Sequence, residues 1–376
     1  MRPFRCVGAV ALAGLVACGT GTLGNQTQQA PSTEFARLVE RLSEPGGYFD
    51  TDNLISNERS YLHVMDQLTM RQLQGGAYVG VGPDQNFSYI AAIRPDIAFI
   101  VDIRRDNVLQ HLMFKALFTV ARTRREYLCL LFGRPVPDDR DQWTEASIGT
   151  LVGYIDSVDT TPAATSTALD TVAATIARFG VPLSDDDLAT LRRFHGQFIR
   201  EGLDLQFQSH GRPPMARYPT LRQLVSETDR TGRQVSYLAS ESAFRIVKSL
   251  QERDRIIPVV GNFAGDHALA AIGDLLGRNG LTVSVFYTSN VELYLMRDGR
   301  FHQFAENVAR LPRDEHSVVI RSYFRRNFGY TPADAVPGYL SVQLLQSMEE
   351  FVTRAEAGVY RSYLDLVAES ALALPQ

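Results

Sequence analysis

Apolar positions along the first third of the chain alternate between short continuous runs and stretches with helical spacing. Residues 57–70 place apolar side chains three residues apart, which predicts a helix. Ala77–Val81 is short and β-prone, and turn residues follow it at 82–84 before a short helical pattern at 86–93. Ile97–Val101 is apolar at every position, as expected for a strand covered on both faces. The order strand, helix, strand over about 30 residues predicts a βαβ crossover.

The same alternation resumes near residue 233, after a segment with helical patterns and no strand pattern. The later strands are expected at residues 235–240, 255–263, 281–290 and 317–324, with helices at 241–254 and 266–280. The strand at 317–324 is expected to be the last, and apolar residues three and four apart predict a helix from 339 to 367. The chain is therefore expected to be α/β, a doubly wound, mostly parallel Rossmann-like sheet with a large helical insertion.

This pattern divides the chain into successive parts. Residues 34–107 and 233–330 are the two portions of the Rossmann-like domain, 108–232 the helical insertion between them, and 331–376 a C-terminal helical tail.

The N-terminus has the composition of an export signal. Arg2 and Arg5 precede an apolar stretch at 7–17, and the segment ends in Leu-Val-Ala before Cys18. Small residues before a cysteine resemble the bacterial lipobox, which predicts a lipoprotein signal peptide at 1–18 and a lipid on Cys18. Residues 19–33 are rich in Gly, Thr and Gln and are expected to be a flexible tether. An ordinary secretory signal, or a wrongly assigned start codon, are the alternatives.

Composition narrows the possible partners. The net charge is −4, with 45% hydrophobic and 21% charged residues, and Lys and Arg are scattered rather than clustered. Nucleic-acid binding is therefore not expected. No Cys/His spacing matches a zinc site, so we expect no metal. The lipobox places the protein in the bacterial envelope, anchored to a membrane, and a cytoplasmic location is the alternative.

Polar residues gather where the expected strands end. Gly80 and Gly82 lie between the first strand and its helix, followed by Asp84, Gln85 and Asn86. Glycine allows close approach of the backbone to a ligand, and a helix N-terminus attracts negative charge. Plain turn geometry is the alternative for the two glycines, and helix capping is the alternative for the three polar residues.

Three more polar residues end later strands. Asp102 lies 22 residues after Gly80, where such folds bind ribose hydroxyls, and Asn262 and Asn290 end two later strands. Because parallel strands end on one edge of a sheet, a common cleft is expected. An ion pair with Arg104 or Arg105 is the alternative for Asp102, and a turn is the alternative for each asparagine. Asn53, Asn57 and Glu58 could fold over this cleft.

At these residues the chain resembles class I S-adenosylmethionine-dependent methyltransferases. "YVGVGPDQ" looks like their glycine motif, "IVDIRRDN" like their ribose-binding second strand, and "RNGLTVSVFY" like their helix into the fifth strand. The resemblance implies a Rossmann-like fold and S-adenosylmethionine as cofactor. Three positions depart from it or from the dinucleotide fingerprint: Tyr78 replaces an acid, and Asp84 and Gln85 replace glycines.

A second resemblance covers most of the mature chain. "GGYFDTDNLISNE", "GGAYVGVGPDQNFSYI" and "FYTSNVELYL" resemble a family of uncharacterised bacterial proteins that includes lipoproteins. It implies no activity. The preferred hypothesis is an exported, non-catalytic lipoprotein with a binding or scaffold role at the crevice, its partner an unknown small molecule or protein. The alternative is an S-adenosylmethionine-dependent methyltransferase of unknown acceptor. No catalytic residue is identified.

Overall fold

The structure is a computed structural model that describes residues 33–136, 143–212, 215–325 and 329–368. The expected signal peptide, Cys18 and residues 19–32 of the expected tether lie outside the described residues.

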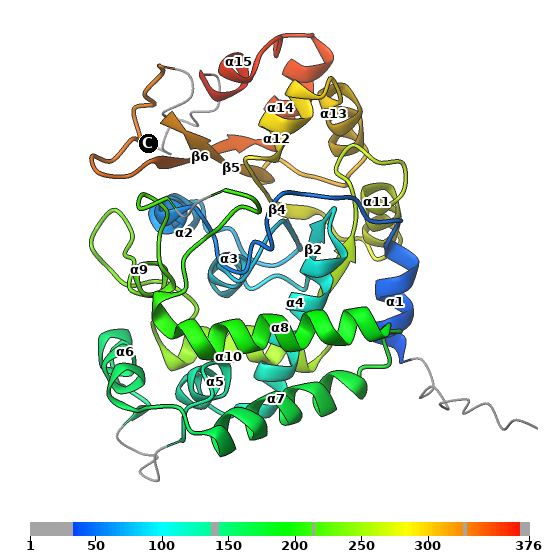
Figure 1. The fold of residues 1–376 in the computed structure, drawn as a ribbon. Coiled ribbons are helices and arrows are strands. Elements are labelled where there is room, and N and C mark those ends of the chain that lie inside the picture. Colours follow the sequence, from blue (N-terminus) through cyan, green and yellow to red (C-terminus); the bar gives the residue numbers. More distant parts are fainter. Residues whose placement is uncertain (1–32, 137–142, 213–214, 326–328, 369–376) are drawn as a thin grey trace, which may run out of the picture. The chain divides into compact units, whose positions relative to one another are not determined.

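A six-stranded sheet lies at the centre of the fold (Figure 1). In the described residues the strands run in the order β3-β2-β1-β4-β5-β6; the first five are parallel to one another, and β6 is antiparallel to β5. Their bounds are β1 (Ala77–Gly80), β2 (Ile97–Asp102), β3 (Ile256–Val260), β4 (Val283–Ser289), β5 (Val318–Phe324) and β6 (Ser341–Ser347). The prediction of a mixed α/β fold with a mostly parallel sheet is confirmed.

The register brings the ends of the parallel strands together. Gly80 is level with Ile100 of β2 and Tyr287 of β4, and Asp102 is level with Val260 of β3. The loops that follow β1 to β4 therefore leave the sheet along one edge, as the sequence predicted.

Helices account for most of the remaining described residues. Their bounds are α1 (Glu34–Leu42), α2 (Met65–Met70), α3 (Gln85–Ile93), α4 (Arg105–Val120), α5 (Arg124–Leu131), α6 (Ile148–Ser157), α7 (Pro162–Ala177), α8 (Asp185–Glu201), α9 (Leu221–Val225), α10 (Glu241–Glu252), α11 (Ala268–Arg278), α12 (Val291–Arg297), α13 (Phe301–Ala309), α14 (Met348–Glu356) and α15 (Tyr363–Ala368), with short 3₁₀ helices η1 (Arg59–Val64) and η3 (Gly202–Asp204). None is long and apolar enough to cross a bilayer in the part of the chain described.

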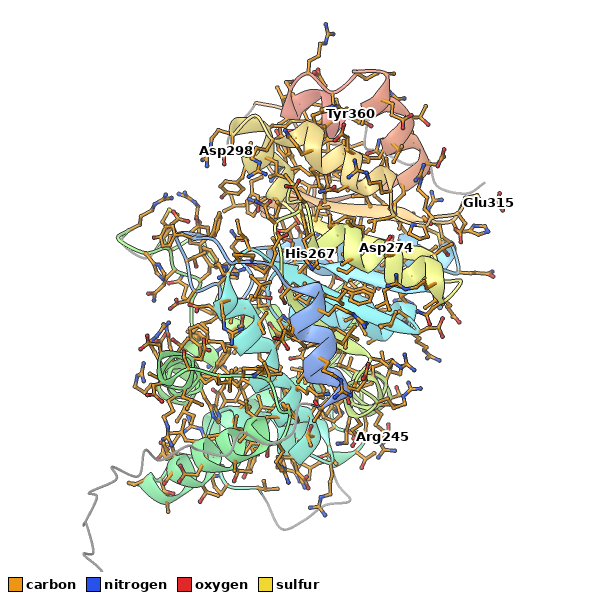
Figure 2. All side chains as sticks on the ribbon, turned by 90° about the vertical axis from the view of Figure 1, so that its right-hand side faces the viewer. Arg245, His267, Asp274, Asp298, Glu315 and Tyr360 are labelled. Carbon is orange, nitrogen blue, oxygen red and sulfur yellow. The ribbon has the colours of Figure 1, made fainter. Side chains whose placement is uncertain are left out.

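Two groups of helices enclose the sheet. Helices α3, α4 and α10 pack together, with α4 against β2 and β3. Helices α1, α11 and α13 form the other group, and α1 contacts both β3 and α11. Figure 2 shows His267 at the start of α11, and its Nε2–H donates to the carbonyl of Arg41 in α1 at 2.8 Å. Every residue of β1, β2 and β3 is buried, as the apolar runs in the sequence indicated.

Apart from 137–142 and 213–214, which are not described, the segment between β2 and β3 is mainly helical and has one isolated β-bridge, between Gln206 and Thr220. Helices α7 and α8 run beside each other below the sheet in Figure 1 and contact each other and α4. A capping box starts α8, where Ser184 accepts from the Asp187 backbone and Asp187 accepts from the Ser184 backbone. The first helix of this segment, α4, is buried on almost all sides and belongs to the packing of the sheet.

The prediction of a strand at 235–240 is wrong. These residues form turns, and the backbone N–H of Tyr237 donates to Ser88 Oγ in α3 at 3.2 Å. The pattern of residues was β-prone, but packing against α3 takes the place of pairing with a strand.

The expected C-terminal helix is also wrong in its first part, and β5 is not the last strand. Residues 341–347 form β6, which pairs with β5 from Ser341 opposite Phe324 to Ser347 opposite Val318. Its sequence hides the strand, because the alternation of polar and apolar residues lasts only from Ser341 to Leu344 and both Gln343 and Gln346 bind polar partners inside the fold.

Candidate functional site

A cavity of about 360 Å³ lies at the edge where β1, β2, β3 and β4 end. This volume is within the range of small-molecule sites, and the position is the crevice where open α/β sheets bind ligands. Five predicted site residues line the cavity: Gly82, Gln85, Asp102, Asn262 and Asn290. The predicted convergence of strand ends around one cleft is therefore present in the structure.

Three predicted residues, Gly80, Asn86 and Asp84, do not line this cavity. Asn86 is fully buried, accepts from Tyr78 Oη at 2.7 Å and donates to the carbonyls of Val81 and Pro83 at 2.9 and 2.7 Å. A Cβ on Gly80 would come within 2.1 Å of Asn86 Oδ1. Gly80 and Asn86 therefore shape the turn after β1. This is the alternative that the sequence left open for Gly80, whereas Asn86 donates to carbonyls of the turn and does not cap α3.

Gly82 combines a role in the turn with a place at the cavity. Its φ of 85° lies in the left-handed region that favours glycine. Its carbonyl oxygen accepts from Asn86 Nδ2, Asn107 Nδ2 and His111 Nε2 at 3.3, 3.0 and 2.9 Å. Burial lowers the pKa of His111 to about 4, so this imidazole is neutral at pH 7. Three side chains thus fix the loop conformation.

Asp84 lies behind the cavity, beside the insertion. Its Oδ2 accepts from Tyr237 Oη at 3.0 Å. Burial raises the pKa of Asp84 to about 6, and the bond from Tyr237 opposes this shift. Asp84 therefore joins α3 to the 235–240 turn.

Asp102 forms an ion pair with Arg104. Arg104 Nη2 is 2.7 Å from Asp102 Oδ2 and Nε is 2.9 Å from Oδ1, so the contact is bidentate. Arg104 Nη1 also donates to the carbonyls of Thr51 and Asp52, both at 2.8 Å. Both carboxylate oxygens thus bind Arg104, which is the ion pair that the sequence offered as the alternative to ribose binding. Asp102 nevertheless lines the cavity.

The segment before η1 covers the cavity. Asn53, Asn57 and Glu58 all line it, as the sequence suggested. Tyr48 and Phe49 line it as well, and the Phe49 ring meets the Tyr294 ring edge-on with centroids 5.1 Å apart. These three aromatic residues were not predicted from the sequence, because no periodic pattern marks them.

Glu58 is a buried carboxylate on the cavity wall. Its Oε2 accepts from Tyr287 Oη at 2.5 Å, from Ser322 Oγ and from Gln343 Nε2 at 3.1 Å, and its Oε1 accepts from Ser289 Oγ. No lysine, arginine or histidine nitrogen of the described chain lies within 4.0 Å of it. Burial is the main cause that raises the pKa of Tyr287 well above its ordinary value, and the negative charge of Glu58 is the second.

The ends of β3 and β4 form the far side of the cavity. The Asn262 backbone N–H donates to Glu44 Oε1 at 2.6 Å, which fixes the turn after β3. Ser289 has a φ of 53°, a conformation that L-residues other than asparagine and aspartate rarely adopt. Strain of this kind is concentrated at functional sites. Asn290 follows it and caps no helix N–H with its side chain.

A second cavity of about 450 Å³ adjoins the first. The two share eight lining residues, namely Tyr48, Phe49, Asn53, Asn57, Ser289, Asn290, Tyr294 and Arg297. The second cavity extends toward Phe207, Ser209, Arg212 and Tyr218. The site can therefore hold two molecules, or one elongated molecule.

Across residues 33–136, 143–212, 215–325 and 329–368, no three His, Cys, Asp or Glu side chains are grouped as a metal site. Cys129 is fully buried, and burial raises the pKa of its thiol to about 12, so it is a packing residue.

Comparison with known proteins identifies the family. A family model described as a domain of unknown function, DUF7790, matches residues 54–146 and 211–371, together more than half of the 376 residues. The chain belongs to this family. A search of curated proteins gave no match. The matched residues include the ends of β1 to β4 and Glu58, whereas the unmatched interval 147–210 holds α6, α7 and α8.

Proposed function

We propose that this protein binds a nucleoside-type small molecule in the cavity at the strand ends, with S-adenosylmethionine and its demethylated product as specific candidates. One observation carries the proposal: polar residues from the ends of four successive parallel strands line a single cavity of about 360 Å³. Ligands of open α/β sheets bind at this edge.

The strand order supports the finer assignment of a doubly wound, Rossmann-like domain. The order β3-β2-β1-β4-β5-β6 is the one found in dinucleotide-binding domains, and an antiparallel edge strand is common in such sheets. Aromatic rings at Phe49 and Tyr294 offer flat surfaces for a base. The Asp102–Arg104 pair differs from a free ribose-binding acid, so ribose contact falls to Asn262 and Asn290.

A titration tests the proposal. The full chain is titrated by calorimetry with S-adenosylmethionine and with S-adenosylhomocysteine. We expect heat from at least one, and Asn290→Trp, which fills the cavity, to weaken it about tenfold or more. Asn279→Trp, exposed beyond the other end of the sheet, is the matched control. Absence of heat and of any thermal shift with both compounds would remove the proposal.

The second cavity favours an alternative function, methyl transfer to a small molecule or protein. Because it opens onto Ser289 and Asn290, an acceptor there would lie beside a cofactor in the first cavity. Catalysis would depend mainly on proximity and orientation. Methyl transfer from labelled S-adenosylmethionine to lysate components, lost in Asn290→Trp, would support this function over binding alone.

We further propose that the protein is exported and anchored through a lipid on Cys18. The support is the sequence of residues 1–18. Palmitate labelling of the wild type against Cys18→Ala decides the matter, because equal labelling would favour a cytoplasmic protein.

A further inference from the structure

Two hydrogen-bond acceptors on the inner wall of the cavity lack a full set of protein partners. Gln85 is 6% exposed, and its Oε1 has no hydrogen-bond partner in the described chain. Glu58 is 1% exposed, and its Oε1 accepts from Ser289 alone among the described residues. A buried acceptor without a donor is costly, and such groups in folded proteins call for an explanation.

The hydroxyl of Tyr287 fixes which way the Gln85 amide points. This hydroxyl has one hydrogen, which it donates to Glu58 Oε2 at 2.5 Å. It can therefore only accept from Gln85, whose Nε2 lies 3.3 Å away. The amide nitrogen faces Tyr287, and the amide oxygen is left for another donor. The same hydroxyl links Gln85 Nε2 to Glu58 Oε2, so the two side chains are neighbours, and both residues line the cavity.

Glu58 differs from the other two carboxylates that line the cavity, because no cation of the described chain pairs with it. Asp102 is paired with Arg104, and Asp298 is paired with Arg297 at 3.2 Å. Glu58 has only uncharged donors within the described residues: two serines, one tyrosine and one glutamine. A cation that enters the cavity therefore finds its strongest attraction at Glu58.

We propose that Glu58 and Gln85 form the binding site for a primary ammonium group of the ligand. This inference rests on the proposed function and makes the ligand more specific: a nucleoside that carries an amino-acid-like side chain. A primary ammonium supplies three N–H donors and a positive charge, which matches one carboxylate and one amide oxygen. A sulfonium has the charge without donors, and a hydroxyl has a donor without the charge.

The test compares two ligands that differ in this group alone. The full chain is titrated with S-adenosylhomocysteine and with its desamino analogue, in which hydrogen replaces the amino group. We expect the wild type to bind the amino compound about 10- to 100-fold more tightly, the usual effect of a charge-assisted hydrogen bond. Glu58→Gln should bring the ratio of the two dissociation constants close to one.

Two further variants keep the result interpretable. Gln85→Met preserves volume and removes the open acceptor, so it should lower the ratio in part, and it decides the question if Glu58→Gln does not fold. Asp298→Asn removes a carboxylate from the exposed rim, labelled in Figure 2, and should leave the ratio unchanged.

Equal affinities for the two compounds in the wild type would overturn the ammonium site and leave the nucleoside proposal standing. A ratio that persists in both Glu58→Gln and Gln85→Met would also overturn it, because the amino group would then be recognised elsewhere. Failure of both compounds to bind would remove the proposed function, and this inference with it.

Discussion

Two groups of polar residues near the strand ends differ in how their hydrogen bonds are satisfied. After β1 and at the end of β2, Asn86, which lies outside the cavity, and Asp102, which lines it, are satisfied by the protein itself, through the Val81 and Pro83 carbonyls and through Arg104. Near β4, Glu58 has no cationic partner in the described chain, and Gln85 Oε1 has no described partner. The first group stabilises the loops at the edge of the sheet, whereas the second keeps hydrogen-bond acceptors for a ligand. Position at a strand end does not by itself tell which role a residue has.

The largest effect on stability is expected from removing the ion pair between Asp102 and Arg104. Arg104→Met leaves the Asp102 carboxylate buried without a counter-ion and releases the Thr51 and Asp52 carbonyls. We expect the free energy of unfolding to fall by about 3–5 kcal/mol, measured by denaturant titration. Arg297→Met removes an exposed ion pair and should cost less than about 1 kcal/mol. Equal losses would mean that Arg104 does not neutralise Asp102.

The next effect concerns Asp84, whose pKa in the folded state is about 6 against an ordinary 3.8. Between about pH 4 and pH 6 the folded protein keeps this proton and the unfolded chain has released it. Raising the pH through this window therefore lowers the free energy of unfolding, by about 1–3 kcal/mol from this group. Asp84→Asn should flatten the profile in this window. An unchanged slope would show that Asp84 is not buried as described.

A loss of stability of similar size is expected from Gly80→Ala. The added Cβ meets Asn86 Oδ1 at 2.1 Å and Tyr78 Oη at 2.6 Å, so the hydrogen bond between these groups must break. We expect about 1–3 kcal/mol of destabilisation by thermal or chemical unfolding. Gly277→Ala, in α11 with open space around it, should instead stabilise by about 0.5–1 kcal/mol.

The smallest effect on stability belongs to Tyr48, which is 79% exposed at the cavity. Tyr48→Ala should change the free energy of unfolding by less than about 0.5 kcal/mol. We expect it to weaken S-adenosylhomocysteine binding by about 1 kcal/mol, since the ring offers a stacking surface. Unaltered affinity would exclude Tyr48 from the ligand site.

The sequence predicted the parts of the fold that rest on local pattern. The apolar run at 97–101 and the glycine turn after β1 gave the βαβ unit, and the polar strand ends gave Gln85, Asp102, Asn262 and Asn290 as neighbours. Parallel strands make this possible, because their ends share an edge whatever the loops do.

The remainder depended on contacts between distant residues. Glu58 accepts hydrogen bonds from Ser322 and Gln343, each more than 260 positions away along the chain, and no local pattern indicates these contacts. The strand β6 was hidden because its buried glutamines find partners only in the folded state. The sequence predicted that Asp102 lies at the strand ends. It could not decide whether this carboxylate binds a ligand or pairs with an arginine, because both roles place an acid at the end of β2.

A crystal structure of the protein with S-adenosylhomocysteine tests most directly whether the four strand ends form one ligand site. We predict density for the nucleoside between Gly82, Asn262 and Asn290, with the amino group at Glu58. Ligand density on another face of the molecule, or an empty cavity at saturating ligand, would contradict the account.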